Sequence, residues 1–491
     1  MNERVKALDG AKVKAAHRVQ VVSADADLDA LMGKRFHLIG IGGVGMSALA
    51  RVLLKHGAYV TGSDQSESPV VAGLRIEGAE IAIGHHAEHV PSNTESLVMS
   101  AAVKPENPEL QVAQAQGMRI YKYAEMLGQL MNRYHGIAVA GTHGKSTTSG
   151  WLSYVLRQAG VDVSFVVGAE TPQLQASSGV GESHYFVAEA CEYDRSFHNI
   201  RPVIACILNI EADHLDYYQD EAEIVDAFTQ FALGTVHAGT VVINGQDTNA
   251  SRVIEQLRPD LRCVRFGLGE DCDVRAEDLT LVEGCYQFQV VIRGRNVGQT
   301  CVRLPGLHNV LNALAVVAVA DQLDLPEAVI LPGLASFTGV QRRLMLKDRC
   351  MGITVLDDYA HHPTEIRCSL EAIRQRYPGH RLYCVFQPHQ HSRTRFLLDD
   401  FAESFKLADM TIVPEIYFVR DSEQCRQWVD GEIFVERLRG NGCEAAHIKD
   451  FEAICTALEA QVHSGDVVVT MGAGDVWKVA DEFIQRLRRH C

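Results

Sequence analysis

Short apolar runs alternate with amphipathic stretches along most of the chain. From Arg35 to Asp64 an apolar run leads into a glycine turn, apolar positions then recur at helical spacing, and a second apolar run follows. Buried strands of parallel sheets appear as apolar runs, and the helices between them are amphipathic. The pattern therefore predicts an α/β fold made of strand, turn, helix and strand units.

The pattern begins again at Gly136, and further strand-like runs occur beyond Val340. We predict three domains: a Rossmann-like N-terminal domain (1–133), a P-loop-type central mononucleotide-binding domain (134–339) and a Rossmann-like C-terminal domain (340–491). Residues 262–303 consist of short β-like runs separated by turns, which predicts a β-rich excursion of the middle domain.

Length and composition agree with a large globular protein. The 491 residues exceed what one hydrophobic core usually serves. The net charge of -16 argues against nonspecific attraction to nucleic acid or anionic membranes. No uncharged apolar stretch reaches the roughly 18 residues of a membrane span, and the thirteen cysteines form no C-x-x-C pair. We predict a cytoplasmic protein with reduced thiols, no nucleic-acid partner and no membrane insertion; nothing in the sequence indicates its oligomeric state.

The first glycine turn has the spacing of a nucleotide-binding loop. Gly40, Gly42 and Gly45 form G-x-G-x-x-G between a strand and a helix, and Asp64 ends the next strand about twenty residues later. Glycine lets the backbone approach a pyrophosphate, whose charge is favoured by the free N–H groups of a helix N-terminus. The loop predicts a dinucleotide or diphosphate site, without distinguishing NAD from UDP; a tight turn that binds nothing is the alternative.

The second glycine loop resembles a shortened P-loop, because Val139 stands where the first glycine of the full motif belongs. Its residues are Gly141, Thr142, His143, Gly144, Lys145, Ser146 and Thr147. In such loops backbone N–H groups cradle phosphate, the lysine reaches the β- and γ-phosphates, and the hydroxyl ligates Mg²⁺. The loop predicts ATP binding, against the alternative of a lysine-bearing turn before a helix.

Two acidic clusters follow apolar runs downstream of this loop, where α/β sheets place ligand-binding residues. The first cluster contains Glu189, Glu192 and Asp194, and the second contains Asn209, Glu211, Asp213, His214 and Asp216. Because Mg²⁺ prefers oxygen ligands completed by substrate phosphates, these clusters predict metal or phosphate binding, with His214 as an additional nitrogen ligand. For any one of these acids the alternative is a solvated loop charge.

Polar groups also gather at strand ends of the third predicted domain. They lie at Asp357–Pro363, at Gln387–His389 and at Ser392–Arg395. The adjacent histidines lack the spacing typical of zinc sites. Substrate orientation or helix capping is therefore the favoured interpretation.

Taken in order, these motifs resemble those of the muramyl ligases, which add amino acids to UDP-N-acetylmuramate, over nearly the whole chain from Arg35. The motifs are GIGGVGMS, AGTHGKSTT, E-A-x-E-x-D-x-S-F, NIEADHLDYY, GLHNVLNA, GVQRR, DDYAHHPTE, QPH...SRT and GAGDV. The resemblance implies a UDP-binding first domain, an ATP-binding second domain and a third domain that closes to admit the amino acid. No lysine occurs between Lys145 and Lys347, which favours the alanine-adding branch over sisters that carry a carbamylated lysine.

Carried over position by position, the resemblance implies roles for many residues. The UDP-sugar side would be held by Gly42, Gly43, Gly45, Met46, Ser47, Asp64 and Ser100. ATP would contact the P-loop together with His308, Asn309, Asn312 and Arg342 or Arg343. The metal ligands would be Ser146, Glu189 and His214, and the substrate and alanine side would be formed by Tyr359, His361, His389 and Arg393. Ser146 replaces the usual threonine but keeps the hydroxyl; Cys191 and Gln390 depart from the family pattern and receive no role.

The expected reaction is ATP- and Mg²⁺-dependent ligation of L-alanine to the carboxylate of UDP-N-acetylmuramate through an acyl phosphate. Its catalytic residues would be Lys145, Glu189, His214, His361 and Arg393. His361 is the candidate base, because an imidazole titrates near the working pH. The alternatives are a recycling ligase that attaches an intact tripeptide, an NAD-dependent oxidoreductase and a noncatalytic nucleotide-binding module.

Overall fold

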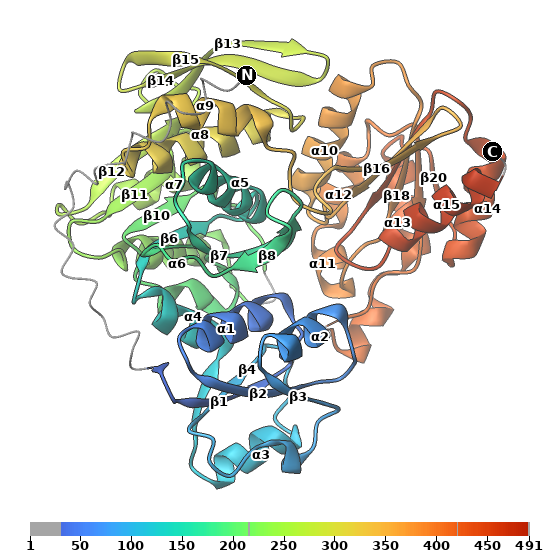
Figure 1. Cartoon of the computed structure of the whole chain (residues 1–491). Helices are drawn as coiled ribbons and strands as arrows, with labels where there is room; N and C mark the ends of the chain where they lie inside the picture. The colour runs from blue at the N-terminus through green and yellow to red at the C-terminus, as the bar shows by residue number, and fades with distance from the viewer. Residues whose placement is uncertain (1–30, 215–216, 420, 490–491) are drawn as a thin grey trace, which may run out of the picture.

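The computed structural model describes residues 31–214, 217–419 and 421–489. Within these ranges the chain forms three β-sheets with helices packed on their faces, which confirms the predicted three-domain α/β class (Figure 1). Residues 1–30 of the predicted first domain and Asp216 of the second acidic cluster lie outside the described residues. No helix in these ranges is long and apolar enough to cross a membrane.

The N-terminal sheet is parallel, with strand order β3-β2-β1-β4-β5. Its strands are β1 (Arg35–Ile39), β2 (Tyr59–Asp64), β3 (Glu80–Ile83), β4 (Ser96–Met99) and β5 (Arg119–Lys122). Its helices are α1 (Val44–Lys55), α2 (Pro69–Ile76), α3 (Pro108–Ala115) and α4 (Tyr123–Met131), with the 3₁₀ turn η2 (Ala87–His89). Successive strands are added on one side of β1 up to β3 and then on its other side from β4, so the strand order reverses beside β1. The first glycine loop follows β1 and lies at this switch point.

The central sheet has the order β15-β14-β13-β12-β11-β10-β6-β9-β7-β8. Its strands are β6 (His135–Ala140), β7 (Ser164–Thr171), β8 (Ala176–Gly179), β9 (Tyr185–Glu189), β10 (Ile204–Ile207), β11 (Thr240–Asn244), β12 (Arg262–Gly267), β13 (Val274–Val282), β14 (Cys285–Ile292) and β15 (Arg295–Val302). Its helical segments are α5 (Lys145–Gln158), η3 (Tyr193–Asn199), α6 (Glu221–Leu233), α7 (Thr248–Ile254), α8 (Leu307–Gln322) and α9 (Glu327–Ser336). The segment predicted as a β-rich excursion continues this sheet, because β12 pairs with β11 and β13, and β13–β15 follow as antiparallel neighbours.

The C-terminal sheet has the order β16-β17-β21-β18-β19-β20, with β16 as an antiparallel edge strand. Its strands are β16 (Met345–Cys350), β17 (Ile353–Asp358), β18 (Leu382–Phe386), β19 (Met410–Val413), β20 (Ala445–His447) and β21 (Val467–Met471). Its helices are α10 (Pro363–Arg376), α11 (His391–Phe396), α12 (Leu398–Ser404), α13 (Gly431–Gly440), α14 (Phe451–Gln461) and α15 (Trp477–Arg489), with η4 (Glu423–Gln427).

The core of the central domain fixes the position of the P-loop helix. Residues 146–156 of α5 are all buried, and the helix packs against α8 and α9. Trp151 of α5 stacks on Phe337 just after α9, with ring centroids 5.0 Å apart. The start of α10 in the C-terminal domain lies near α8, so the two domains meet beside this helix (Figure 1).

Candidate active site

The P-loop turns sharply from β6 into α5. Gly141 (φ 146°) and Gly144 (φ 85°) adopt backbone conformations that favour glycine. A Cβ at Gly144 would lie 2.6 Å from Asn312 Oδ1, so the close approach of α8 also excludes a side chain there. Asn209 clamps the loop: the His143 N–H donates to its Oδ1 at 2.8 Å, and its Nδ2 donates to the His143 carbonyl at 3.1 Å. The two glycines and the Asn209 side chain therefore define the conformation of the loop.

Lys145 forms an ion pair within the site. Its Nζ lies 2.8 Å and 3.0 Å from the carboxylate oxygens of Glu192, and it also donates to the Gly141 and Thr142 carbonyls. The Glu192 side chain is 4% exposed. Burial opposes the charged forms of both groups, but their mutual attraction raises the pKa of Lys145 and lowers that of Glu192. Both remain charged at neutral pH, and a bound phosphate would compete with Glu192 for the lysine.

Ser146 and Glu189 form a set of oxygen donors at the start of α5. The Glu189 carboxylate accepts hydrogen bonds from the Gly168 N–H and the Ser146 hydroxyl. Burial raises the pKa of Glu189 despite these contacts. A partly buried carboxylate beside a hydroxyl, next to a phosphate-binding loop, fits a hard cation such as Mg²⁺.

His214 lies beside Glu192. Its Nε2 is 3.6 Å from Glu192 Oε1 and 3.8 Å from Asp213 Oδ2, and its ring contacts Tyr193 with centroids 4.9 Å apart. The backbone of His214 has a positive φ of 54°. These contacts connect His214 to Glu192, the partner of Lys145, whereas the predicted metal ligands Ser146 and Glu189 contact each other.

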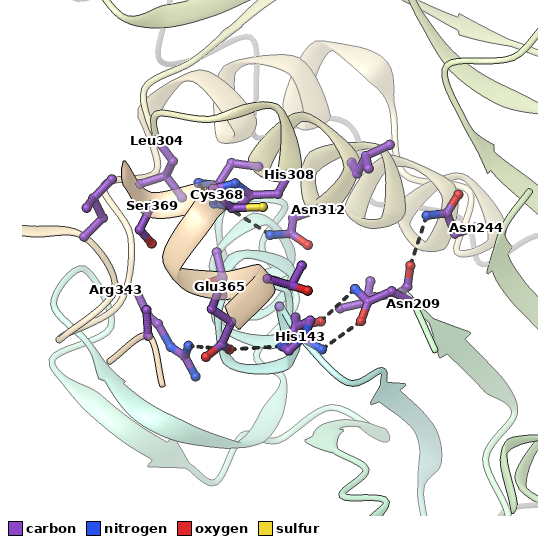
Figure 2. Close-up of a pocket in the computed structure, with 18 of the residues that line it drawn as sticks. His143, Asn209, Asn244, Leu304, His308, Asn312, Arg343, Glu365, Cys368 and Ser369 are labelled. Atoms are coloured by element: carbon purple, nitrogen blue, oxygen red, sulfur yellow. Dashed lines mark hydrogen bonds and ion pairs between the residues drawn. The ribbon is translucent and has the colours of Figure 1, made fainter. Parts of the chain in front are cut away.

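A cavity of about 380 Å³ lies between the P-loop, α8 and α10 (Figure 2). The predicted ATP-binding residues that line it are His143, Gly144, Thr147, His308, Asn309, Asn312 and Arg343. Burial lowers the pKa of His308 to about 4, so its ring is neutral. The side chains of Asn309 and Asn312 are hydrogen bonded to each other at 3.1 Å, and Asn309 also donates to the Pro305 carbonyl. Apolar walls with a few fixed polar groups are typical of a small-molecule site.

The two adjacent arginines have different environments. Arg342 points into the C-terminal domain, where it donates to Asp357 at 3.1 Å and to the Gly472 carbonyl at 2.8 Å. Arg343 lines the cavity and donates to Glu365 at 3.4 Å. Of the two candidates for an interdomain arginine, Arg343 therefore has the position to meet a nucleotide.

The start of α10 contacts the central domain through several polar groups. His143 Nδ1 lies 3.1 Å from Glu365 Oε1, and His143 Nε2 lies 3.5 Å from Glu211 Oε2. The Thr364 hydroxyl donates to Glu211 at 2.7 Å. Burial lowers the pKa of His143, but the two carboxylates outweigh it and raise the value to about 9. His143 is therefore an imidazolium that bridges the two domains.

His143, Glu211 and His362 also have the spacing of a metal site in the described part of the chain, with ligand atoms within 4.8 Å of one another. The His362 nitrogens already contact the Ala212 carbonyl at 3.2 Å and the Thr364 N–H at 3.3 Å. Glu211 accepts from Thr364. Hydrogen bonds across the domain interface therefore account for this cluster.

The predicted alanine side gathers at the ends of β17 and β18. The ring of His361 lies between Tyr359 and His389, at centroid distances of 5.4 Å and 6.2 Å. Burial lowers the pKa of His361 to about 3. The expectation that this ring titrates near the working pH is therefore wrong. Its Nδ1 is 3.0 Å from the Tyr359 carbonyl, which can only accept, so the neutral ring carries its proton there and leaves the Nε2 lone pair available.

Arg393 of α11 reaches across to the central domain. Its Nη2 donates to Asp213 Oδ1 at 3.0 Å, and the two side chains are 10% and 9% exposed. Burial opposes ionisation of Asp213, but Arg393 and neighbouring histidines hold the pKa of this carboxyl well below its usual range. The contact is a buried ion pair between the central and C-terminal domains.

The N-terminal glycine loop is anchored by its own domain. Gly40 (φ 76°) and Ile41 donate their N–H groups to the Ser63 carbonyl, and the Gly42 N–H donates to Asp64 Oδ2 at 2.8 Å. The Ser63 hydroxyl donates to Glu109, which is fully buried. The acidic residue that ends β2 therefore holds the loop in this structure.

The remaining residues of the predicted UDP side surround this loop. Gly43 precedes α1, and Ser100 lies just after β4, with its Oγ 2.9 Å from where a Cβ of Gly40 would be. A Cβ at Gly45 would meet the Tyr123 ring at 2.5 Å. The side chains of Met46 and Ser47 are buried, so neither is exposed to a diphosphate in this structure.

Comparison with known proteins decides the family. Three family models match successive parts of the chain: the Mur ligase family catalytic domain at residues 35–135, the Mur ligase middle domain at 139–320, and the Mur ligase glutamate ligase domain at 342–474. The chain belongs to the Mur ligase family.

Individual Mur ligases resemble the chain over almost their full length. The UDP-N-acetylmuramate–L-alanine ligase of Caldanaerobacter subterraneus subsp. tengcongensis is 40% identical, covering 94% of this chain and all of that protein. The crystal structure of UDP-N-acetylmuramate-alanine ligase from Thermotoga maritima matches with a TM-score of 0.78 at 27% identity, covering 93% of this chain and all of the other. A murein peptide ligase from Psychrobacter arcticus shares the fold with a TM-score of 0.67 at 24% identity, covering 93% of this chain and 99% of the other.

In this Mur ligase the structure adds interface residues to those assigned from the sequence. Glu365, to which no sequence motif assigned a role, contacts the P-loop histidine and a cavity arginine. Glu192 and Asp213 were candidates only as members of acidic clusters, and each has a specific cationic partner. Their position at the carboxyl ends of strands was a usable signal, whereas the identity of each partner depends on domain packing.

Proposed function

We propose that this Mur ligase joins L-alanine to the carboxylate of UDP-N-acetylmuramate and converts ATP to ADP and phosphate. The observation that carries the proposal is full-length similarity, at 40% identity, to a ligase with this name. A P-loop cavity lined from the central and C-terminal domains supports it, since the chemistry needs a nucleotide and two further substrates in one place. ATP and UDP-linked sugars are cytoplasmic metabolites, so the proposed reaction takes place in the cytoplasm.

In the first step a carboxylate oxygen of the sugar attacks the γ-phosphorus, and the bond from that phosphorus to the β–γ bridging oxygen breaks to release ADP. Phosphoryl transfer depends mainly on positioning and charge stabilisation. Lys145 and the N–H groups of the loop hold the phosphates, and Arg343 supplies a second cation at the cavity wall. Ser146 and Glu189 would hold Mg²⁺, which offsets phosphate charge when bound.

In the second step the amine of alanine attacks the acyl carbon, and the tetrahedral intermediate expels phosphate and loses one proton from nitrogen. His361 is our proposed acceptor for that proton, because its neutral ring leaves the Nε2 lone pair available. Its low pKa makes it a weaker base than a solvent-exposed imidazole, so its main contribution is to orient the neutral amine.

A substrate panel tests the proposal. Purified protein is incubated with UDP-N-acetylmuramate, ATP and Mg²⁺ and with L-alanine, glycine, L-serine or an intact tripeptide, and phosphate release and product mass are measured. We expect phosphate release that depends on both sugar and L-alanine. Preferred use of the tripeptide would identify a recycling ligase, and binding of NADH in place of the sugar would contradict the proposed N-terminal site.

A further inference from the structure

Glu365 connects three parts of the proposed site through one carboxylate. It lies in the first turn of α10, and its side chain is 11% exposed. Its Oε1 accepts from His143 Nδ1 at 3.1 Å and from Arg343 at 3.4 Å. Its Oε2 accepts from the backbone N–H of His361 at 3.1 Å (Figure 2 shows the contacts with His143 and Arg343).

Every one of these partners is a donor. A carboxylate can satisfy donors at both oxygens, whereas the amide of glutamine must turn its NH₂ group toward one of them. Burial disfavours the charged form of Glu365, but the surrounding cationic groups and hydrogen bonds keep its pKa well below the usual range. The site is therefore built for an ionised side chain at this position.

Two of the partners face different substrates. His143 belongs to the ATP loop of the central domain and lines the nucleotide cavity. His361 belongs to the C-terminal domain and lies beside Tyr359 and His389, on the proposed alanine side. Only when α10 is docked against the P-loop can one carboxylate contact both histidines.

We propose that Glu365 is a positioning residue that couples docking of the C-terminal domain to the geometry of the ATP loop, by fixing the His143 side chain and the His361 backbone together. This inference rests on the proposed function, because it assigns nucleotide and amine to the two sides of Glu365. The Thr364 hydroxyl donates to Glu211 at 2.7 Å, so this second contact between α10 and the central domain does not depend on the Glu365 side chain.

A double-mutant cycle of Glu365→Gln, His143→Gln and both together tests the coupling. We expect Glu365→Gln to lower kcat by roughly tenfold to a hundredfold, the range for lost hydrogen bonds to a charged group, and to raise the KM for ATP. If the two residues act as one unit, the double variant should lose little more than the worse single variant. The inference is overturned if the fold-losses in kcat of the two single variants multiply in the double variant, or if the kcat of Glu365→Gln stays within twofold of wild type.

A pH series supplies a readout that a merely structural residue would not move. Several titratable or charged groups face His143: Glu211 after β10, His308 on α8, Arg343, and His362 and Glu365 at the start of α10. Removing one of its two carboxylates should let His143 lose its proton at lower pH. Affinity for a nonhydrolysable ATP analogue should then fall for Glu365→Gln between about pH 7 and about pH 8, a range in which the wild-type His143, with its pKa of about 9, stays mostly protonated. If affinity for the ATP analogue has the same pH dependence in wild type and Glu365→Gln, the inference is contradicted.

Glu371→Gln is the matched control, because Glu371 is exposed on the same helix. It should keep wild-type kcat, KM and pH profile. Glu365→Asp restores the charge on a shorter side chain and should recover part of the lost activity. If wild type and Glu371→Gln form no product from UDP-N-acetylmuramate and alanine, the proposed function fails; if they are active and Glu365→Gln is too, only the coupling fails.

Discussion

Lys145 forms a buried ion pair with Glu192, so removing the lysine should affect both catalysis and stability. Lys145→Ala should reduce turnover on the order of 10³-fold or more, because the phosphates lose their central cation, while UDP-sugar affinity stays within about tenfold. It should also destabilise the protein, since the buried Glu192 carboxylate then loses the ammonium group that pairs with it.

Lys145→Ala combined with Glu192→Gln distinguishes the two effects. The double variant should recover thermal stability without recovering phosphate release. Near-normal phosphate release by Lys145→Ala would contradict the assignment of the ATP loop.

The protonation of His143 predicts a stability change in alkaline solution. Its folded pKa of about 9 lies above the ordinary 6.5, so its stabilising contribution is complete below about pH 6.5 and is lost as pH rises through about 9. The difference between the folded pKa and the ordinary pKa of His143 corresponds to at most roughly 3 kcal/mol in the free energy of unfolding. Calorimetry should show that wild type melts at a higher temperature than His143→Gln, and that this difference in melting temperature narrows between about pH 7 and about pH 10. A difference that stays constant or widens would contradict an imidazolium at this position.

At the scale of elements, the junction of β1 with α1 depends on the absence of a side chain at Gly42. A Cβ there would lie 2.9 Å from Asp64 Oδ2 and 3.0 Å from Val71 Cγ2 of α2. Gly42→Val should therefore displace the loop and weaken UDP-sugar binding far more than ATP binding, as titration of each ligand would measure. Gly73→Ala is a matched control, since its Cβ would meet only side-chain atoms at 3.9 Å. Equal losses of both ligands for Gly42→Val would refute the UDP assignment.

At the scale of the whole molecule, the Arg393–Asp213 pair joins the central and C-terminal domains. Arg393→Ala should keep ATP and UDP-sugar affinity within about tenfold, roughly 1.4 kcal/mol, yet lose alanine-dependent ligation far more severely, because an undocked C-terminal domain leaves the amine site incomplete. Ligand titrations paired with product formation measure both quantities. Arg393→Ala with Asp213→Asn controls for the buried charge left behind. An ATP affinity that falls as far as ligation would place Arg393 on the nucleotide side.

Local patterns in the sequence were sufficient to predict the α/β class, the three domains and the two glycine loops. Strand and helix periodicity is set by neighbouring residues, and a glycine between a strand and a helix has the same backbone requirement in any fold of this class. The sequence also placed the candidate residues at strand ends, which meet at one edge of a parallel sheet. It predicted residues 262–303 as β-rich for the same reason, but not that they extend the central sheet.

Only the tertiary structure decided which charged groups meet. Glu365 contacts His143 from 222 residues away, and Arg393 contacts Asp213 from 180 residues away, so no local pattern specifies these pairs. Burial is likewise a property of the packed domains. It lowers the pKa of His361 to about 3, while two carboxylates from different domains raise that of His143 to about 9. The sequence by itself determined the elements and the kinds of groups at their ends; the packing of the domains determined the partners and protonation of those groups, because solvation and electrostatic fields depend on distance in space and not along the chain.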